Sequence, residues 1–222
     1  MIPEVFILFL VAAAAYLIGA IPTAVIISKA VHRRDIRLSG SGNPGAANMW
    51  RTFGMTWAAI VIAVDFGKGF LVAWQLPRLF GWHSPAWAAA LGLLAVMGHV
   101  WSPYIHFGGG KGVGVALGAA TALYPPLGLA SIAVWIAVVF ISSYASLGSL
   151  LAIASYPAAL YWREEYERIE LLLALATFSL ILFTHRSNIR RLATGRELKV
   201  GMRRDRLAAP RASKSPELSD EK

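Results

Sequence analysis

Long apolar stretches alternate with short polar segments along the chain. Seven such stretches cover approximately Val5 to Ser28, Met55 to Leu76, Pro85 to Tyr104, Val113 to Tyr124, Leu127 to Ile141, Leu147 to Trp162 and Ile169 to Phe183. A helix that crosses a bilayer needs about 20 mostly apolar residues. The pattern therefore predicts an all-α integral membrane protein with seven transmembrane helices, of which the fourth to sixth are short.

Composition supports this class. The chain is 57% hydrophobic and 15% charged, and its mean hydropathy of +0.57 is too high for a soluble domain of this size. Because there is no cysteine, disulfides, thiolate nucleophiles and cysteine metal sites are excluded. We expect one membrane domain over residues 1–199, whose first helix is retained rather than cleaved as a signal peptide. Residues 200–222 are charged and contain Pro and Ser, which predicts a disordered cytoplasmic tail.

The basic residues are unevenly distributed between the two ends of the predicted helices. Seventeen of the 21 Lys and Arg residues fall on one side of the expected topology. Cytoplasmic loops carry the excess of Lys and Arg, so the N-terminus is expected outside and the C-terminus in the cytoplasm of a bacterial inner membrane. Anionic lipid headgroups explain the basic tail without a nucleic-acid partner.

A glycine-rich segment, Gly108 to Gly112, contains Lys111 at its centre. Glycine allows backbone N–H groups to approach an anion, and a following helix N-terminus favours negative charge. A flexible hinge between two helices would also be glycine-rich, but it would not require a lysine. The segment predicts a phosphate-binding loop, and Gly112 after Lys111 distinguishes it from a Walker loop.

A second polar cluster follows the first apolar stretch. It combines small residues with amides and a cation: Ser41, Asn43, Gly45, Asn48 and Arg51. A simple turn would account for the Gly and Pro residues, but not for two asparagines and an arginine at membrane depth. Polar groups there are usually functional, so we predict a binding site.

A third cluster follows the last apolar stretch and contains His185, Asn188 and Glu197. A basic flank that stops transfer would explain the arginines around it, but not the histidine, the amide or the carboxylate. Ser146 lies in another polar segment on the same side, although serines in membrane helices commonly bond only to their own backbone.

Asp65 and Lys68 lie three residues apart in the second apolar stretch, where they share one helix face. We expect a buried ion pair that joins helices; orientation of Lys111 or Arg51 is the alternative. His99 is expected to satisfy a neighbour's hydrogen bond.

All three clusters fall on the predicted cytoplasmic face, so they are expected to form one site. The site has cations, amides and a histidine, but no carboxylate cluster suited to a divalent metal. It therefore suits phosphate-bearing substrates without a metal or cofactor. A transporter of phosphorylated metabolites is the competing class, because transporters also place helix N-termini near charged groups.

Three motifs carry a family resemblance: SGNPGAAN with Arg51 three residues on, GHVWSPYIHFGGGKGVG, and HRSNIRRLATGRE. In this order and spacing, the chain from the first helix to Lys199 resembles the bacterial acyl-phosphate:glycerol-3-phosphate acyltransferases. Two further segments, Asp65 to Gly69 and Ser146 to Ser149, are similar to that family. Ala47 and Gly114-Val115 depart from it, because threonines are common at these places.

The resemblance implies a seven-helix enzyme that transfers an acyl group from acyl phosphate to the sn-1 hydroxyl of glycerol 3-phosphate, giving lysophosphatidic acid and phosphate. Such an enzyme would act as a monomer among membrane lipids. The catalytic positions it implies are Ser41, Arg51, Lys111, His185 and Asn188. The substrate-binding positions are Asn43, Gly45, Asn48, Gly109, Gly110, Gly112, Ser146 and Glu197. The proton of the attacking hydroxyl would pass to His185 or, as we favour, to a substrate phosphate oxygen.

Overall fold

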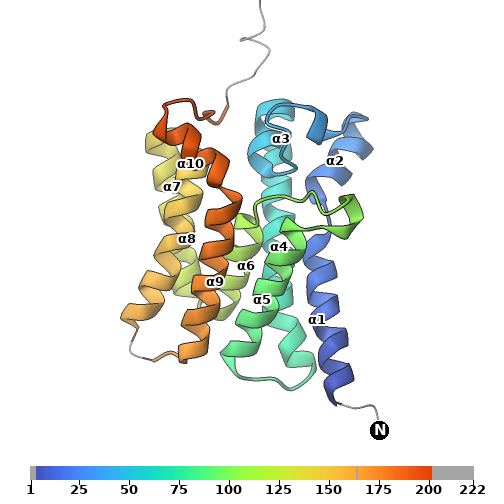
Figure 1. Cartoon of the computed structure of the whole chain (residues 1–222), viewed down its shortest axis with the longest axis vertical. Helices are drawn as coiled ribbons and strands as arrows, with labels where there is room; N and C mark the ends of the chain where they lie inside the picture. The colour runs from blue at the N-terminus through green and yellow to red at the C-terminus, as the bar shows by residue number, and fades with distance from the viewer. Residues whose placement is uncertain (1–3, 164, 202–222) are drawn as a thin grey trace, which may run out of the picture.

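The computed structural model describes residues 4–163 and 165–201, and the regular secondary structure in this part of the chain is all helical (Figure 1). The helices are α1 (Glu4–Ala20), α2 (Thr23–His32), α3 (Ala46–Phe53), α4 (Met55–Leu79), α5 (Pro85–Val100), α6 (Val113–Leu123), α7 (Pro125–Ser142), α8 (Ala145–Trp162), α9 (Arg168–Thr184) and α10 (Arg186–Ala193), with short 3-10 turns at η1 (Ile36–Leu38) and η2 (Pro103–Ile105). The expected tail lies almost entirely outside the described residues.

A helix occupies each of the seven apolar stretches, so the all-α prediction is confirmed. Within the described residues, three spans are long and apolar enough to cross a membrane: Met55–Leu79, Pro85–Ile105 and Pro125–Ser142. The number rises to 5 if each of two bent helix pairs, α1 with α2 and α9 with α10, is one span. Seven crossings therefore remain a prediction.

The first apolar stretch was predicted to be one continuous helix, and this prediction is wrong. It breaks at Ile21 and Pro22, and α1 and α2 meet at a bend of 42°. Proline has no N–H and disfavours helical backbone at the residue before it. The break leaves the carbonyls of Ala20 and Ile21 available, and they accept hydrogen bonds from Ser102 Oγ at 2.6 Å and from Lys68 Nζ at 2.8 Å.

Helix α6 packs closely against α4 through two glycines. A Cβ atom on Gly69 would lie 2.0 Å from the carbonyl oxygen of Val115, and one on Gly118 would lie 2.0 Å from that of Phe66. Small residues allow such close backbone approach between membrane helices. With 11 residues, α6 is only about 16 Å long, so it occupies part of the bundle's depth and the loop before it enters the bundle.

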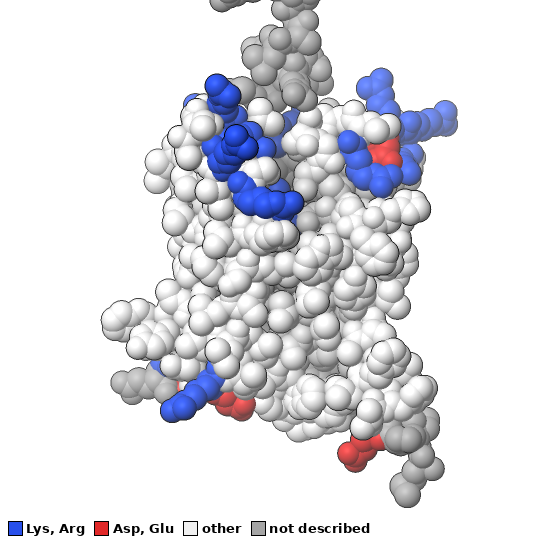
Figure 2. All heavy atoms as spheres, viewed as in Figure 1, with Lys and Arg blue, Asp and Glu red and all other residues white. Residues whose placement is uncertain are grey.

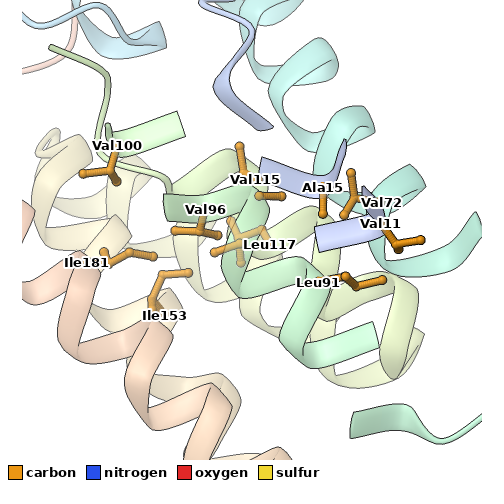
Figure 3. Close-up of a cluster of buried hydrophobic side chains, with 12 residues drawn as sticks. Val11, Ala15, Val72, Leu91, Val96, Val100, Val115, Leu117, Ile153 and Ile181 are labelled. Atoms are coloured by element: carbon orange, nitrogen blue, oxygen red, sulfur yellow. The ribbon is translucent and has the colours of Figure 1, made fainter. Parts of the chain in front are cut away.

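The main apolar core surrounds α6. Figure 3 shows Val115 and Leu117 of α6 among Val96 of α5, Ile153 of α8 and Ile181 of α9, and all of these side chains are buried. The core fixes α6, and with it the preceding loop, against three other helices.

Charged residues gather at the two ends of the bundle and leave its middle apolar. Figure 2 shows most of the visible Lys and Arg at the end formed by α2, α3 and α10, with an acidic patch among them, whereas the opposite end carries acidic side chains and fewer basic ones. This distribution is typical of a protein with an apolar belt facing lipid.

Candidate active site

A cavity of about 750 Å³ opens between α3, α4, α6, α7, α8 and the α9–α10 corner. It brings the three polar clusters together, as the sequence analysis expected. Twelve of the thirteen predicted site residues line it: Ser41, Asn43, Gly45, Asn48, Arg51, Gly109, Lys111, Gly112, Ser146, His185, Asn188 and Glu197. The exception is Gly110, which is buried beneath the His99 ring and is not part of the lining.

The first cluster is shaped by Asn48, which is 1% exposed. Its side-chain Nδ2 donates to the carbonyls of Ile36 and Ser39 at 3.1 and 3.0 Å, and its Oδ1 accepts from the backbone N–H of Ser41 at 2.9 Å. The Asn48 amide is thus occupied by the loop itself. Its observed contacts hold Ser41 at the cavity rather than offer a free group to a substrate.

Arg51 lies one helical turn beyond Asn48 on α3 and reaches across the cavity. Its guanidinium donates from Nη2 to the carbonyl of Leu198 at 2.9 Å and from Nε to that of Lys199 at 3.2 Å. Burial lowers the pKa of Arg51, but arginine remains a cation in proteins. The carbonyls are neutral and the Glu197 carboxylate acts on Arg51 only through its charge, without a hydrogen bond, so an anion in the cavity would interact favourably with the guanidinium.

The glycine loop differs from the expected nest of free N–H groups. The N–H of Gly109 donates to the carbonyl of Val100 at 3.0 Å, and that of Gly110 donates to His99 at 3.0 Å. The first hydrogen bond of α6 runs from the N–H of Ala116 to the carbonyl of Gly112. The N–H groups that come before Ala116 at the start of α6 therefore have no acceptor within the helix. The anion-binding end of this segment is therefore the α6 N-terminus with Lys111, rather than Gly109 and Gly110.

Lys111 extends from this loop toward the third cluster. Its ammonium group donates to Asn188 Oδ1, and its carbonyl accepts from Thr184 Oγ1 at 3.2 Å. Burial lowers the pKa of Lys111 to about 8, with the nearby Arg191 and Arg51 charges acting in the same direction. Lys111 is thus still mainly protonated at neutral pH.

Glu197 is the centre of the third cluster. Its Oε1 accepts from Ser146 Oγ at 2.8 Å and from Asn188 Nδ2 at 2.6 Å, and its Oε2 accepts from Arg191 Nε at 2.7 Å. Burial acts to raise the pKa of the Glu197 carboxyl, but these three hydrogen bonds outweigh burial and keep the pKa below its ordinary value. The carboxylate therefore ties α8, α10 and the segment after α10 together and orients the Asn188 amide toward Lys111.

His185 is 2% exposed and lies at the corner between α9 and α10. Its Nδ1 is 2.9 Å from the carbonyl of Ile181. A carbonyl only accepts, so Nδ1 carries the proton. In the neutral ring Nε2 then has no proton and can accept a hydrogen bond.

The sequence model of a protein family described as glycerol-3-phosphate acyltransferase matches residues 9–195. The chain belongs to the glycerol-3-phosphate acyltransferase family. The matched range contains the first two polar clusters and the third as far as Gly195.

Relatives in this family match over most of their length. The glycerol-3-phosphate acyltransferase of Bordetella pertussis is 40% identical over 196 residues, which are 86% of this chain and 90% of that protein. That of Photobacterium profundum is 39% identical over 195 residues, covering 87% and 93%.

Two solved structures share the fold of these acyltransferases. The crystal structure of PlsY (YgiH), an integral membrane glycerol 3-phosphate acyltransferase, in its glycerol 3-phosphate form is 36% identical, with a TM-score of 0.81 over 90% of this chain and 98% of that one. The lysophosphatidic acid form gives a TM-score of 0.78 over 87% and 95%. The integral membrane class is therefore shown for this fold.

Two features of the site were not selected from the sequence. Arg191 lines the cavity and binds Glu197. Its position three residues after Asn188 places both on one helix face and could have indicated it, but the segment contains several other arginines. The apolar wall of the cavity was also missed. Its members on α4, α6 and α7 are Ile62, Phe66, Leu117, Ile132, Trp135 and Ile136. These residues are typical membrane-helix residues, so nothing in the sequence distinguishes them.

No group of three or more His, Asp or Glu side chains suited to a metal ion occurs among residues 4–163 and 165–201. The polar part of the cavity instead offers cations, amides and two carboxylates that the protein already engages, Glu197 with three hydrogen bonds and Asp65 with Lys68 and Thr23.

Proposed function

We propose that this protein transfers a fatty acyl group from acyl phosphate to the sn-1 hydroxyl of glycerol 3-phosphate, giving lysophosphatidic acid and phosphate. The family and the names of its relatives support glycerol 3-phosphate as the acceptor. The observation that carries the proposal is that a single cavity joins two partly buried cations, Arg51 and Lys111, to an apolar wall. A phosphorylated head and a fatty acyl chain need those two environments together.

The polar end is suited to two phosphate groups. Lys111 and the α6 N-terminus form one anion site, and Arg51 with Ser41 forms a second in the same cavity. Two sites allow two phosphorylated substrates to lie side by side, which brings the glycerol hydroxyl to the acyl carbonyl.

The apolar wall is the proposed path of the acyl chain. Phe66 and Trp135 lie on the α4 and α7 sides of the cavity. Ile62 and Ile136 also line it, and their side chains are 37% and 57% exposed. We expect the cavity to open toward lipid at these residues, so that a long chain extends from it into the bilayer.

The reaction needs no covalent enzyme intermediate, because an acyl phosphate is already activated. The glycerol oxygen forms a bond to the carbonyl carbon while the bond from that carbon to the phosphate oxygen breaks, and phosphate leaves. The hydroxyl proton passes to a phosphate oxygen of the bound donor, whose basicity increases as it leaves. His185 Nε2 is the second available acceptor. Lys111 and Arg51 stabilise the negative charge that moves onto the phosphate.

The enzyme acts as a monomer with its cavity facing the cytoplasm of a bacterial inner membrane. The cavity opens at the end where Lys and Arg gather (Figure 2), which the positive-inside rule assigns to the cytoplasm.

The test is lysophosphatidic acid formation by purified protein in detergent, with acyl phosphate or acyl-CoA as donor and EDTA present. Acyl phosphate is expected to support turnover, and orthophosphate is expected to inhibit as a product. Activity with acyl-CoA alone, or a strict need for Mg²⁺, would contradict the proposal. A transporter would require sealed vesicles, whereas this enzyme releases phosphate without them.

A further inference from the structure

A buried cluster of Asp65, Lys68 and His99 lies at the wall of the cavity, which Asp65 and His99 line, and has no part in the reaction proposed above. Lys68 Nζ is 2.9 Å from Asp65 Oδ1 and 3.0 Å from His99 Nδ1. Their exposed fractions are 6%, 6% and 8%. Charged groups at membrane depth are costly and usually functional. An ion pair between α4 residues alone would neutralise the charges, but it would not require a histidine from α5.

The position of His99 is explained by what lies on its other side. An ammonium group only donates, so Nδ1 accepts from Lys68 and Nε2 carries the ring proton. A Cβ atom added to Gly110 would lie 2.2 Å from His99 Nε2 and 3.1 Å from the two adjoining ring carbons. The ring is therefore packed directly against the Gly110 backbone.

The main chain of the same turn holds the loop as well. The carbonyls of His99 and Val100 accept the N–H groups of Gly110 and Gly109, both at 3.0 Å. A Cβ atom on Gly109 would lie 1.9 Å from the His99 carbonyl oxygen. The backbone of the two glycines is thus packed closely against the C-terminal end of α5, and Lys111 is the next residue in the chain.

The cluster is itself fixed to the break between α1 and α2. Thr23 Oγ1 donates to Asp65 Oδ1 at 2.8 Å, and Lys68 Nζ donates to the carbonyl of Ile21 at 2.8 Å. A continuous series of contacts therefore runs from the break through α4 and His99 to the glycine loop.

We propose that the Asp65–Lys68–His99 cluster is a positioning unit that sets the place of the Lys111 ammonium in the cavity. It acts through Gly110, against whose backbone the His99 ring packs, and it does not touch the reacting atoms. This inference rests on the proposed function, because it assumes that Lys111 binds a substrate phosphate. Misplacement of a reacting or binding group by about 1 Å costs on the order of 100-fold in rate, so a small shift of the loop should be measurable.

The experiment is a pair of single variants and their combination. Gly110→Ala forces the loop away from the ring and is expected to lower kcat/KM for glycerol 3-phosphate by about 100-fold and to weaken inhibition by orthophosphate. His99→Asn removes Nε2 but keeps an oxygen acceptor for Lys68, with an expected loss of about 10-fold. The double variant has room for the new methyl group, so both kinetic measures should recover to those of His99→Asn.

Two other glycines provide matched controls. Gly67→Ala on α4 meets nothing within 4 Å and should leave the kinetics unchanged. Gly109→Ala meets backbone oxygens, so its loss should not be recovered by His99→Asn. If the cluster only stabilised the fold, every variant with a kinetic loss would have a lower melting temperature. The His99→Asn/Gly110→Ala double variant would then not regain inhibition by orthophosphate.

Normal kinetics in Gly110→Ala, or a loss that His99→Asn does not recover, would overturn the positioning role. If Gly110→Ala does not fold, His99→Asn alone decides, and an unchanged kcat/KM in it would overturn the inference. Lys111→Ala separates the two proposals. Full activity of Lys111→Ala contradicts the proposed function. If Lys111→Ala is inactive but His99→Asn does not restore the kinetics of Gly110→Ala, the positioning role alone is overturned.

Discussion

Lys111 is the residue whose charge state is most sensitive to the environment that the fold creates. Burial lowers its pKa to about 8. It therefore loses its proton as pH rises through about 8, while a substrate phosphate is already doubly ionised above pH 6 or so. We expect kcat/KM for glycerol 3-phosphate to fall as pH rises through this window.

The Lys111→Arg variant checks the assignment. Arginine stays protonated, so the decline at high pH should move upward or disappear in a pH–rate profile, even if the maximal rate is lower. Lys111→Ala should lose about 100- to 1,000-fold in kcat. An unchanged decline near pH 8 in the arginine variant would assign it to another group.

Glu197 affects stability as well as the arrangement of the site. Its carboxyl pKa is below the ordinary value, so its stabilising contribution is complete above that value and is lost as pH falls through the lowered pKa. Glu197→Gln is expected to lower the free energy of unfolding by about 1–3 kcal/mol at pH 7, and by less in acid.

Thermal unfolding in detergent across pH measures this difference. Glu165, whose side chain is 90% exposed, provides the control, because Glu165→Gln should leave stability unchanged. A deficit in Glu197→Gln that stays constant down to the most acid pH would show that the carboxylate charge is not responsible.

The segment that follows α10, residues 194–201, crosses the cavity and is called the strap below. Besides the Glu197 hydrogen bonds, its carbonyls at Leu198 and Lys199 accept from Arg51. The N–H of Val200 donates to the carbonyl of Ser143 at 2.8 Å. The strap therefore connects α3 to the α7–α8 corner and closes one side of the site.

Two truncations test this role. A chain that ends after Gly201 keeps every strap contact and is expected to retain activity close to that of the full chain, because the removed residues are charged and poor in apolar side chains. A chain that ends after Thr194 loses the strap and should lose nearly all activity. Comparable activity of the two truncated proteins in the phosphate-release assay would contradict the role of the strap.

The whole molecule is polarised, with the cavity and most basic groups at one end (Figure 2). Its orientation is testable because the chain contains no cysteine. A single cysteine at the exposed position His83, between α4 and α5, is expected to react with a membrane-impermeant maleimide in intact cells. One at Arg196, on the strap, should react only after permeabilisation. The reverse pattern would place the active site outside.

Hydropathy and charge along the chain were sufficient to predict the class of this protein. Apolar stretches of helical length specify membrane helices whatever their partners are, and polar groups between them must collect at the bundle ends. The three motifs gave the family, which the comparisons confirm, and twelve of the thirteen residues chosen from them line one cavity.

Only the tertiary structure decided which groups in that cavity remain available. Arg51 meets Leu198 across 147 residues, and Lys111 meets Asn188 across 77. Hydrogen bonds over such separations leave no local pattern in the sequence. The same holds for the glycine loop, because its composition indicates a nest whether or not its N–H groups find carbonyls on α5. Sequence determines which groups can bind phosphate, whereas packing determines which of them are already satisfied by the protein itself.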